Sequence, residues 1–158
     1  MRVEARLAEL GLVLPEPMRP PPGTRLPFAF VRLSHGRAFV AGHGPTLPDG
    51  SLAGPFGKVP TEVTPEQANA SARLVCLAML ASLKRALDDL DRVTAWVRIF
   101  GMVNATSDFK RHPDVINGCS DLLLELYGEA GQHARSAVGM ASLPFNIPVE
   151  IEAEVEFT

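Results

Sequence analysis

The sequence predicts an α+β fold in which two helices cover one face of a mostly antiparallel sheet. Apolar segments with strand periodicity and longer segments with helical periodicity follow each other in the order ββ-α-β-α-ββ. The final strand alternates apolar and acidic residues without interruption. With 158 residues, 46% of them hydrophobic, the chain suits a single domain that buries a core without disulfides.

The N-terminal residues 1–27 are expected to add a short helix and an arm to a core of residues 28–158. Glu4 to Gly11 has helical spacing, with glycine as its stop. Five prolines fall within the eight residues from Pro15 to Pro22. Such a segment favours an extended arm and not a separate domain.

Two strands, Phe28–Leu33 and Arg37–Ala41, are expected to form a hairpin through a Ser-His-Gly turn. The Gly- and Pro-rich segment from Gly42 to Pro60 then predicts a long loop, and irregular loops of this length are often functional. Thr64 and Gln67 have the spacing of a capping box, with proline at the first helical position. The helix that they open is expected to run to about residue 90.

The second half of the chain supplies the rest of the sheet. The segment Val93–Val103 is apolar on both faces apart from Arg98, which predicts a central strand. A helix is expected over Pro113–Tyr127, followed by strands Ala134–Leu143 and Val149–Phe157. In the last strand the glutamates share one face and the apolar residues share the other.

Both faces of the central strand are expected to need burial. By simple alternation, one face carries Val97, Ile99 and Val103 and the other carries Trp96, Phe100 and Met102. Because two helices cover only one face of the sheet, the apolar side chains on the other face predict contact with another subunit.

Composition excludes several classes of function. The net charge is −3 and no run of basic residues is present, which argues against nucleic acid as the main ligand. No apolar segment approaches membrane-spanning length, so no membrane partner is expected. Cys76 and Cys119 lie in predicted helices, which favours reduced thiols in a soluble, cytoplasmic protein. The four histidines lack ligand spacing, and no metal site is expected.

Arg135 and Glu150 remain as the candidates for chemistry. Arg135 lies in a strand of small and apolar residues, where a guanidinium offers a planar fork that matches a carboxylate. A structural ion pair with a strand glutamate explains the same residue equally well. Any of the glutamates from Glu150 to Glu156 that loses solvent would have a raised pKa and be suited to carry a proton.

The two candidates do not meet in a simple hairpin. If the last two strands pair about the Pro144–Pro148 loop, Arg135 falls opposite Glu156, and Glu150 lies roughly 20 Å away. Either these strands are not hairpin partners, or a second subunit completes the site. We favour the second explanation.

Three segments near the C-terminus together resemble the YjgF/RidA family of small-metabolite deaminases. They are HARSAV at His133–Val138, Leu-Pro at positions 143 and 144, and VEIEA at Val149–Ala153. Gly42 and His43 stand where the family has the Gly-Gln of Ser-Gly-Gln-x-Pro, and Phe109 and Asn117 resemble its Phe and Asn. The resemblance extends from about Phe28 to the C-terminus.

The resemblance implies a chorismate-mutase-like fold that assembles as a homotrimer with clefts between subunits. It also implies that Arg135 grips the carboxylate of the substrate and that Glu150 positions or activates water. The substrate would be a reactive enamine or imine such as 2-aminoacrylate, hydrolysed to a 2-keto acid and ammonia without a cofactor. Asn117, His43, Gly42, Ala137 and Phe28 are the expected substrate-binding residues.

Several positions depart from the family pattern. Ala137 replaces a cysteine, Ala41 replaces a serine, His43 replaces a glutamine, and Phe28 is the nearest residue to a ligand-contacting tyrosine. The N-terminal helix and arm are additional. These differences indicate a divergent branch with a different pocket lining.

Two other functions compete with the deaminase. A non-catalytic protein that binds a keto acid or similar anion through Arg135 is the first alternative. An endoribonuclease, an activity attached to the family by name, is less favoured because the chain is acidic, with a pI of about 5.8.

Overall fold

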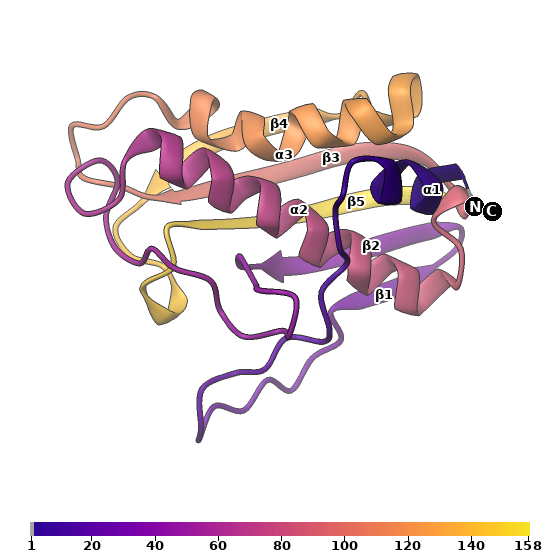
Figure 1. Cartoon of the computed structure of the whole chain (residues 1–158), viewed down its shortest axis with the longest axis horizontal. Coiled ribbons are helices and arrows are strands. Elements are labelled where there is room, and N and C mark those ends of the chain that lie inside the picture. Colours follow the sequence, from indigo (N-terminus) through magenta and orange to yellow (C-terminus); the bar gives the residue numbers. More distant parts are fainter. Residues whose placement is uncertain (1) are drawn as a thin grey trace.

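Five strands form one sheet in the computed structural model, which describes residues 2–158 (Figure 1). Across the sheet the order is β1 (Val31–Ser34), β2 (Arg37–His43), β5 (Val149–Phe157), β3 (Val93–Asn104) and β4 (Ala134–Met140). Strands β3 and β4 are parallel, and the other neighbouring pairs are antiparallel. The predicted α+β fold is therefore confirmed.

Helices α2 (Pro65–Leu87) and α3 (His112–Tyr127) lie side by side on one face of the sheet, as predicted (Figure 1). The capping box is present, because the Gln67 N–H donates to Thr64 Oγ1 at 3.0 Å and the Thr64 N–H donates to Gln67 Oε1 at 2.9 Å. Three short 3₁₀ helices complete the fold: η1 (Leu90–Arg92), η2 (Gly128–Gly131) and η3 (Pro144–Asn146).

The central strand β3 corrects one prediction about its faces. Trp96 pairs with Val155 and Arg98 pairs with Glu154, so β3 has one more residue than β5 in this interval. This bulge at Val97 turns Trp96 to the helix-covered face, where it is 1% exposed and its ring lies 6.0 Å from that of Tyr127. Simple alternation had placed Trp96 on the opposite face.

The last two strands are not hairpin partners. β5 lies between β2 and β3, whereas β4 pairs with β3 at the edge of the sheet. Arg135 aligns with Ile99, and Glu150 aligns with Met102, three residues further along β3. Arg135 and Glu150 are therefore separated by two strand spacings across the sheet and by three residues along it, which places their Cα atoms roughly 14 Å apart. The distance of about 20 Å expected from a hairpin was wrong.

The N-terminal arm is attached to the loop that follows β2. Helix α1 (Arg2–Glu9) packs near α3, and the chain then runs past the end of α2 before turning back into β1 (Figure 1). The Glu16 N–H donates to Pro48 O and the Arg19 N–H donates to Gly50 O, both at 2.9 Å. Strand β1 begins only at Val31, so Phe28 belongs to the arm and not to the predicted strand.

No helix within residues 2–158 combines the length and apolar character needed to cross a membrane.

Candidate functional site

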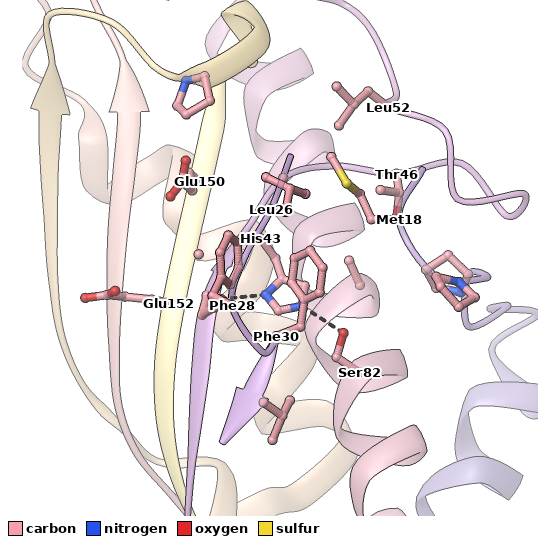
Figure 2. Close-up of a pocket in the computed structure, with 18 of the residues that line it drawn as sticks. Met18, Leu26, Phe28, Phe30, His43, Thr46, Leu52, Ser82, Glu150 and Glu152 are labelled. Atoms are coloured by element: carbon pink, nitrogen blue, oxygen red, sulfur yellow. Dashed lines mark hydrogen bonds between the residues drawn. The ribbon is translucent and has the colours of Figure 1, made fainter. Parts of the chain in front are cut away.

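A cavity of about 730 Å³ lies where the arm, β2, α2 and β5 come together (Figure 2). Four of the predicted site residues contribute to its wall, namely Phe28, Gly42, His43 and Glu150. Ser82 and Arg85 of α2 line it from the covered side of the sheet, and Glu150 and Glu152 come from the uncovered side. The cavity thus extends past the end of β2 and is open to groups from both faces.

His43 is held in one tautomer inside this cavity. Its Nδ1 lies 2.5 Å from the Ala41 carbonyl oxygen, so Nδ1 carries the proton, and its Nε2 accepts from Ser82 Oγ at 2.8 Å (Figure 2). Arg85 donates to Ser82 Oγ at 3.2 Å and to the Pro15 carbonyl at 3.2 Å. This chain of hydrogen bonds joins the arm, α2 and β2.

The pKa of His43 lies at about 4, because burial disfavours its charged form more strongly than the hydrogen bond to Ala41 favours it. The unfolded chain, in which histidine has a pKa near 6.5, therefore takes up the proton first as the pH falls. We expect the unfolding free energy of the wild type to fall by about 2 kcal/mol more than that of His43→Gln between pH 7 and pH 5.

Urea unfolding at both pH values measures this difference. Glutamine is the matched replacement, since its amide can donate to Ala41 O and accept from Ser82 without titrating. An equal pH dependence in the two proteins would show that His43 is not buried in its neutral form.

Glu150 packs directly over Gly42. A Cβ atom at position 42 would collide with the Glu150 carboxylate, so glycine at this position lets the Glu150 side chain keep its place. Glu150 is half-buried, and desolvation, followed by repulsion from Glu152, raises the pKa of its carboxyl group. Among residues 2–158 no Lys, Arg or His nitrogen lies within 4.0 Å of it.

Arg135 lies on the other side of the sheet, over α3. Its Nη1 donates to Ser120 Oγ at 3.0 Å, and its Nη2 donates to the Pro113 carbonyl at 3.3 Å. Asn117 is on the same stripe of α3, three residues before Ser120, and Ala137 follows Arg135 on the same face of β4. In the described part of the chain no carboxylate oxygen lies within 4.0 Å of the guanidinium, so the structural ion pair is not formed.

The surroundings of Arg135 repeat the arrangement around Arg85. Ser120 Oγ lies 2.8 Å from His133 Nε2, and His133 Nδ1 lies 2.7 Å from the Gly131 carbonyl oxygen. Each arginine therefore donates to a helix serine that bonds a histidine, and each histidine bonds a carbonyl two residues earlier. Burial lowers the pKa of His133, and the charge of Arg135 lowers it further.

The predicted site residues thus form two separate groups. Phe28, Gly42, His43 and Glu150 share the cavity, whereas Arg135, Asn117 and Ala137 lie along α3 and β4. Because Arg135 and Glu150 project from opposite faces of the sheet, one chain does not bring them together. Ser82, Arg85, Ser120 and the arm are components of the site that were not predicted from the sequence. Ser82 interrupts the apolar face of α2, which was the one available signal.

A group of three candidate metal ligands, Glu4, Asp89 and Asp91, occurs among residues 2–158 near α1. Glu4 forms an ion pair with Lys84 at 2.9 Å and also accepts from the Leu90 N–H. Asp89 accepts from the Asp91 N–H at 2.8 Å, and the Asp91 carboxylate accepts from the Val3 N–H of α1 at 2.9 Å. Local capping and ion pairing therefore account for this group.

Comparison with protein-family models matches residues 4–152 to the family described as "YjgF/chorismate_mutase-like, putative endoribonuclease". Protein TCP17 of Trypanosoma cruzi is 36% identical over 157 residues, covering 98% of this chain and 94% of that protein.

Two solved structures are similar over 99% of this chain, so the match includes the N-terminal helix and arm. Protein Atu1372 of Agrobacterium tumefaciens, described as having unknown function, has 37% identity and a TM-score of 0.87, with 92% of its chain covered. A "putative endoribonuclease" of Shewanella oneidensis has 30% identity and a TM-score of 0.88, with 100% of its chain covered. Yeast Mmf1, at 19% identity and a TM-score of 0.59, shares the fold alone.

Proposed function

Because the chain belongs to the YjgF/chorismate mutase-like family, we propose that it hydrolyses small enamines or imines bearing a carboxylate, giving a 2-keto acid and ammonia. The observation that carries this proposal is that Arg135 is held by hydrogen bonds but has no acidic partner in the described part of the chain. Arg135 is half-buried and its guanidinium is oriented by Ser120 and Pro113, yet among residues 2–158 no carboxylate oxygen lies within 4.0 Å of it. An oriented arginine without an acidic partner is suited to bind a carboxylate ligand.

Glu150 supplies the proton transfer in this scheme. A water molecule attacks the carbon of the imine, whose nitrogen is protonated, while Glu150 accepts one of the water protons, and the product of this step is a neutral carbinolamine. Glu150 returns the proton to nitrogen. The C–N bond then breaks as the hydroxyl group of the carbinolamine passes its proton to Glu150, and the departing ammonia takes up this proton, so ammonium and the 2-keto acid leave. An enamine first takes a proton at carbon to become the imine. Desolvation raises the pKa of the Glu150 carboxyl group, which makes it a stronger proton acceptor than an exposed glutamate and suits it to carry the proton between water and nitrogen.

The site requires two copies of the chain in this proposal. Arg135 and Glu150 lie on opposite faces of one sheet, so a carboxylate bound by Arg135 of one subunit must meet Glu150 of a neighbour. We propose a homotrimer with three such clefts. Half-buried Phe100 and Met102 on the uncovered face support an assembly through this surface.

Replacement of Glu150 by glutamine tests the proton transfer. We expect kcat for keto-acid release to fall at least about 100-fold with little change in KM, because the amide keeps the shape but accepts no proton. The substrate is generated in the assay by an enzyme that releases 2-aminoacrylate. Glu156→Gln is the matched control, since Glu156 lies on the same face of β5 but pairs with Arg37. Similar kcat values for Glu150→Gln and the wild type would reject this role.

A keto-acid binder without catalysis is the second candidate, since Arg135 would serve it equally well. It predicts binding of 2-keto acids by calorimetry together with no enzyme-dependent keto-acid release. The endoribonuclease activity in the family description is less supported, because acidic Glu16, Glu150 and Glu152 line the cavity and the net charge is −3.

A further inference from the structure

We infer that the cavity beneath the N-terminal arm receives an apolar side chain of the substrate, so the preferred substrates derive from larger aliphatic or aromatic amino acids. This inference rests on the proposed function and deepens it by naming the class of substrate. Three features of the cavity carry it: its size, the character of its walls, and its continuity with Glu150.

The size of the cavity exceeds what a three-carbon substrate fills. Its volume is about 730 Å³, which lies within the range of pockets that hold drug-sized molecules. The arm creates much of this space by covering the end of β2 and α2, with Pro15 fixed by Arg85. A site made only for 2-aminoacrylate has no use for this enclosure.

The walls are predominantly apolar where they face away from Glu150. Met18 and Leu26 of the arm, Phe28, Phe30 and Leu52 all contribute side chains to the lining, and Figure 2 shows Leu26 and Met18 above the Phe28–His43–Phe30 group. Phe30 packs against Phe28 and against the His43 ring, with centroids 5.3 and 5.1 Å apart. Apolar side chains that line an open cavity gain free energy when an apolar group displaces water.

The ionisable groups in the cavity wall do not favour a charged side chain on the substrate. His43 is neutral, and its two nitrogens are occupied by Ala41 and Ser82. The Arg85 guanidinium donates to Ser82 and Pro15. Glu16 and Glu152 also line the cavity and disfavour an anionic side chain.

The cavity is continuous with the proposed reaction centre. Glu150 lines it, and the glycine at position 42 leaves the space that the Glu150 carboxylate occupies. A substrate held by its carboxylate, with its reacting carbon at Glu150, therefore directs its side chain into the cavity.

The test compares imines formed in the assay from alanine and from leucine by an amino-acid oxidase. We expect kcat/KM of the wild type to be at least about tenfold higher for the leucine-derived imine, which has three more carbons to bury. Met18→Trp should reduce the leucine-derived value about tenfold and leave the alanine-derived value within about twofold. Val13→Trp is the matched control, since Val13 is 61% exposed on the same arm and outside the lining.

Preference for the alanine-derived imine, or an equal loss of both activities in Met18→Trp, overturns the inference. Preference for a glutamate-derived imine also overturns it and assigns Arg85 to a second carboxylate. If the wild type accelerates hydrolysis of none of the three imines, derived from alanine, leucine and glutamate, the proposed function fails. Calorimetry with 2-keto acids then tests the apolar pocket independently of catalysis. Binding of 4-methyl-2-oxopentanoate at least tenfold tighter than pyruvate, lost in Met18→Trp, supports the apolar pocket, and equal binding refutes it.

Discussion

Replacement of Arg135 by alanine is expected to lower kcat/KM for keto-acid release by about 100-fold or more. Losing one partner of a desolvated, hydrogen-bonded charge pair typically costs 2–5 kcal/mol, and the substrate carboxylate would lose both its countercharge and a bidentate donor. Arg135→Lys keeps the charge but not the planar fork, so we expect an intermediate loss of about tenfold.

The fold should survive this change. Ser120 Oγ retains its hydrogen bond with His133 when Arg135 is absent, so no buried hydroxyl group is left unpaired. Arg6→Ala is the matched control, because Arg6 is a partly exposed arginine that pairs with Glu9 and Glu125 far from the site. Steady-state rates for the four proteins, with circular dichroism to verify folding, complete the experiment. More than half of wild-type activity in Arg135→Ala would remove the carboxylate clamp from the mechanism.

The predicted elements were recovered because their signals are local. Each signal is contained in a short stretch of sequence. Examples are the capping box at Thr64, the repeat of apolar residues along α2, and the alternation of apolar and acidic residues in Val149–Phe157. The errors concern non-local pairing. Alternation along β3 gives no warning of the bulge at Val97, since a bulge is defined by the partner strand β5.

In the candidate site, too, the identity of the residues was predictable from local sequence, whereas their relative position was not. The motif segments identified Arg135 and Glu150, but their relative position depended on β3 lying between β4 and β5. Direct pairing of the last two strands would have put Arg135 and Glu150 roughly 20 Å apart. The alternative, that these strands are not hairpin partners, is confirmed. The proposal of a second subunit now rests on a different observation, which is that the Arg135 and Glu150 side chains project from opposite faces of the sheet.

The arm was the least predictable part of the site. Its prolines indicated an extended conformation, but not which surface it would cover. That position is fixed by contacts distant in sequence, namely Pro15 with Arg85, Glu16 with Pro48 and Arg19 with Gly50. Likewise, the hydrogen bond between His43 and Ser82 joins residues 39 positions apart.

The central claim is that Arg135 of one subunit and Glu150 of another form one site, and mixed oligomers test it most directly. Arg135→Ala and Glu150→Gln proteins, each nearly inactive alone, are unfolded together in equal amounts and refolded. If each site takes one residue from each of two subunits, random assembly makes about a quarter of the sites intact. We therefore expect about a quarter of wild-type keto-acid release from the mixture. Activity no higher than that of the separate variants, in oligomers shown to be mixed, would contradict the shared site.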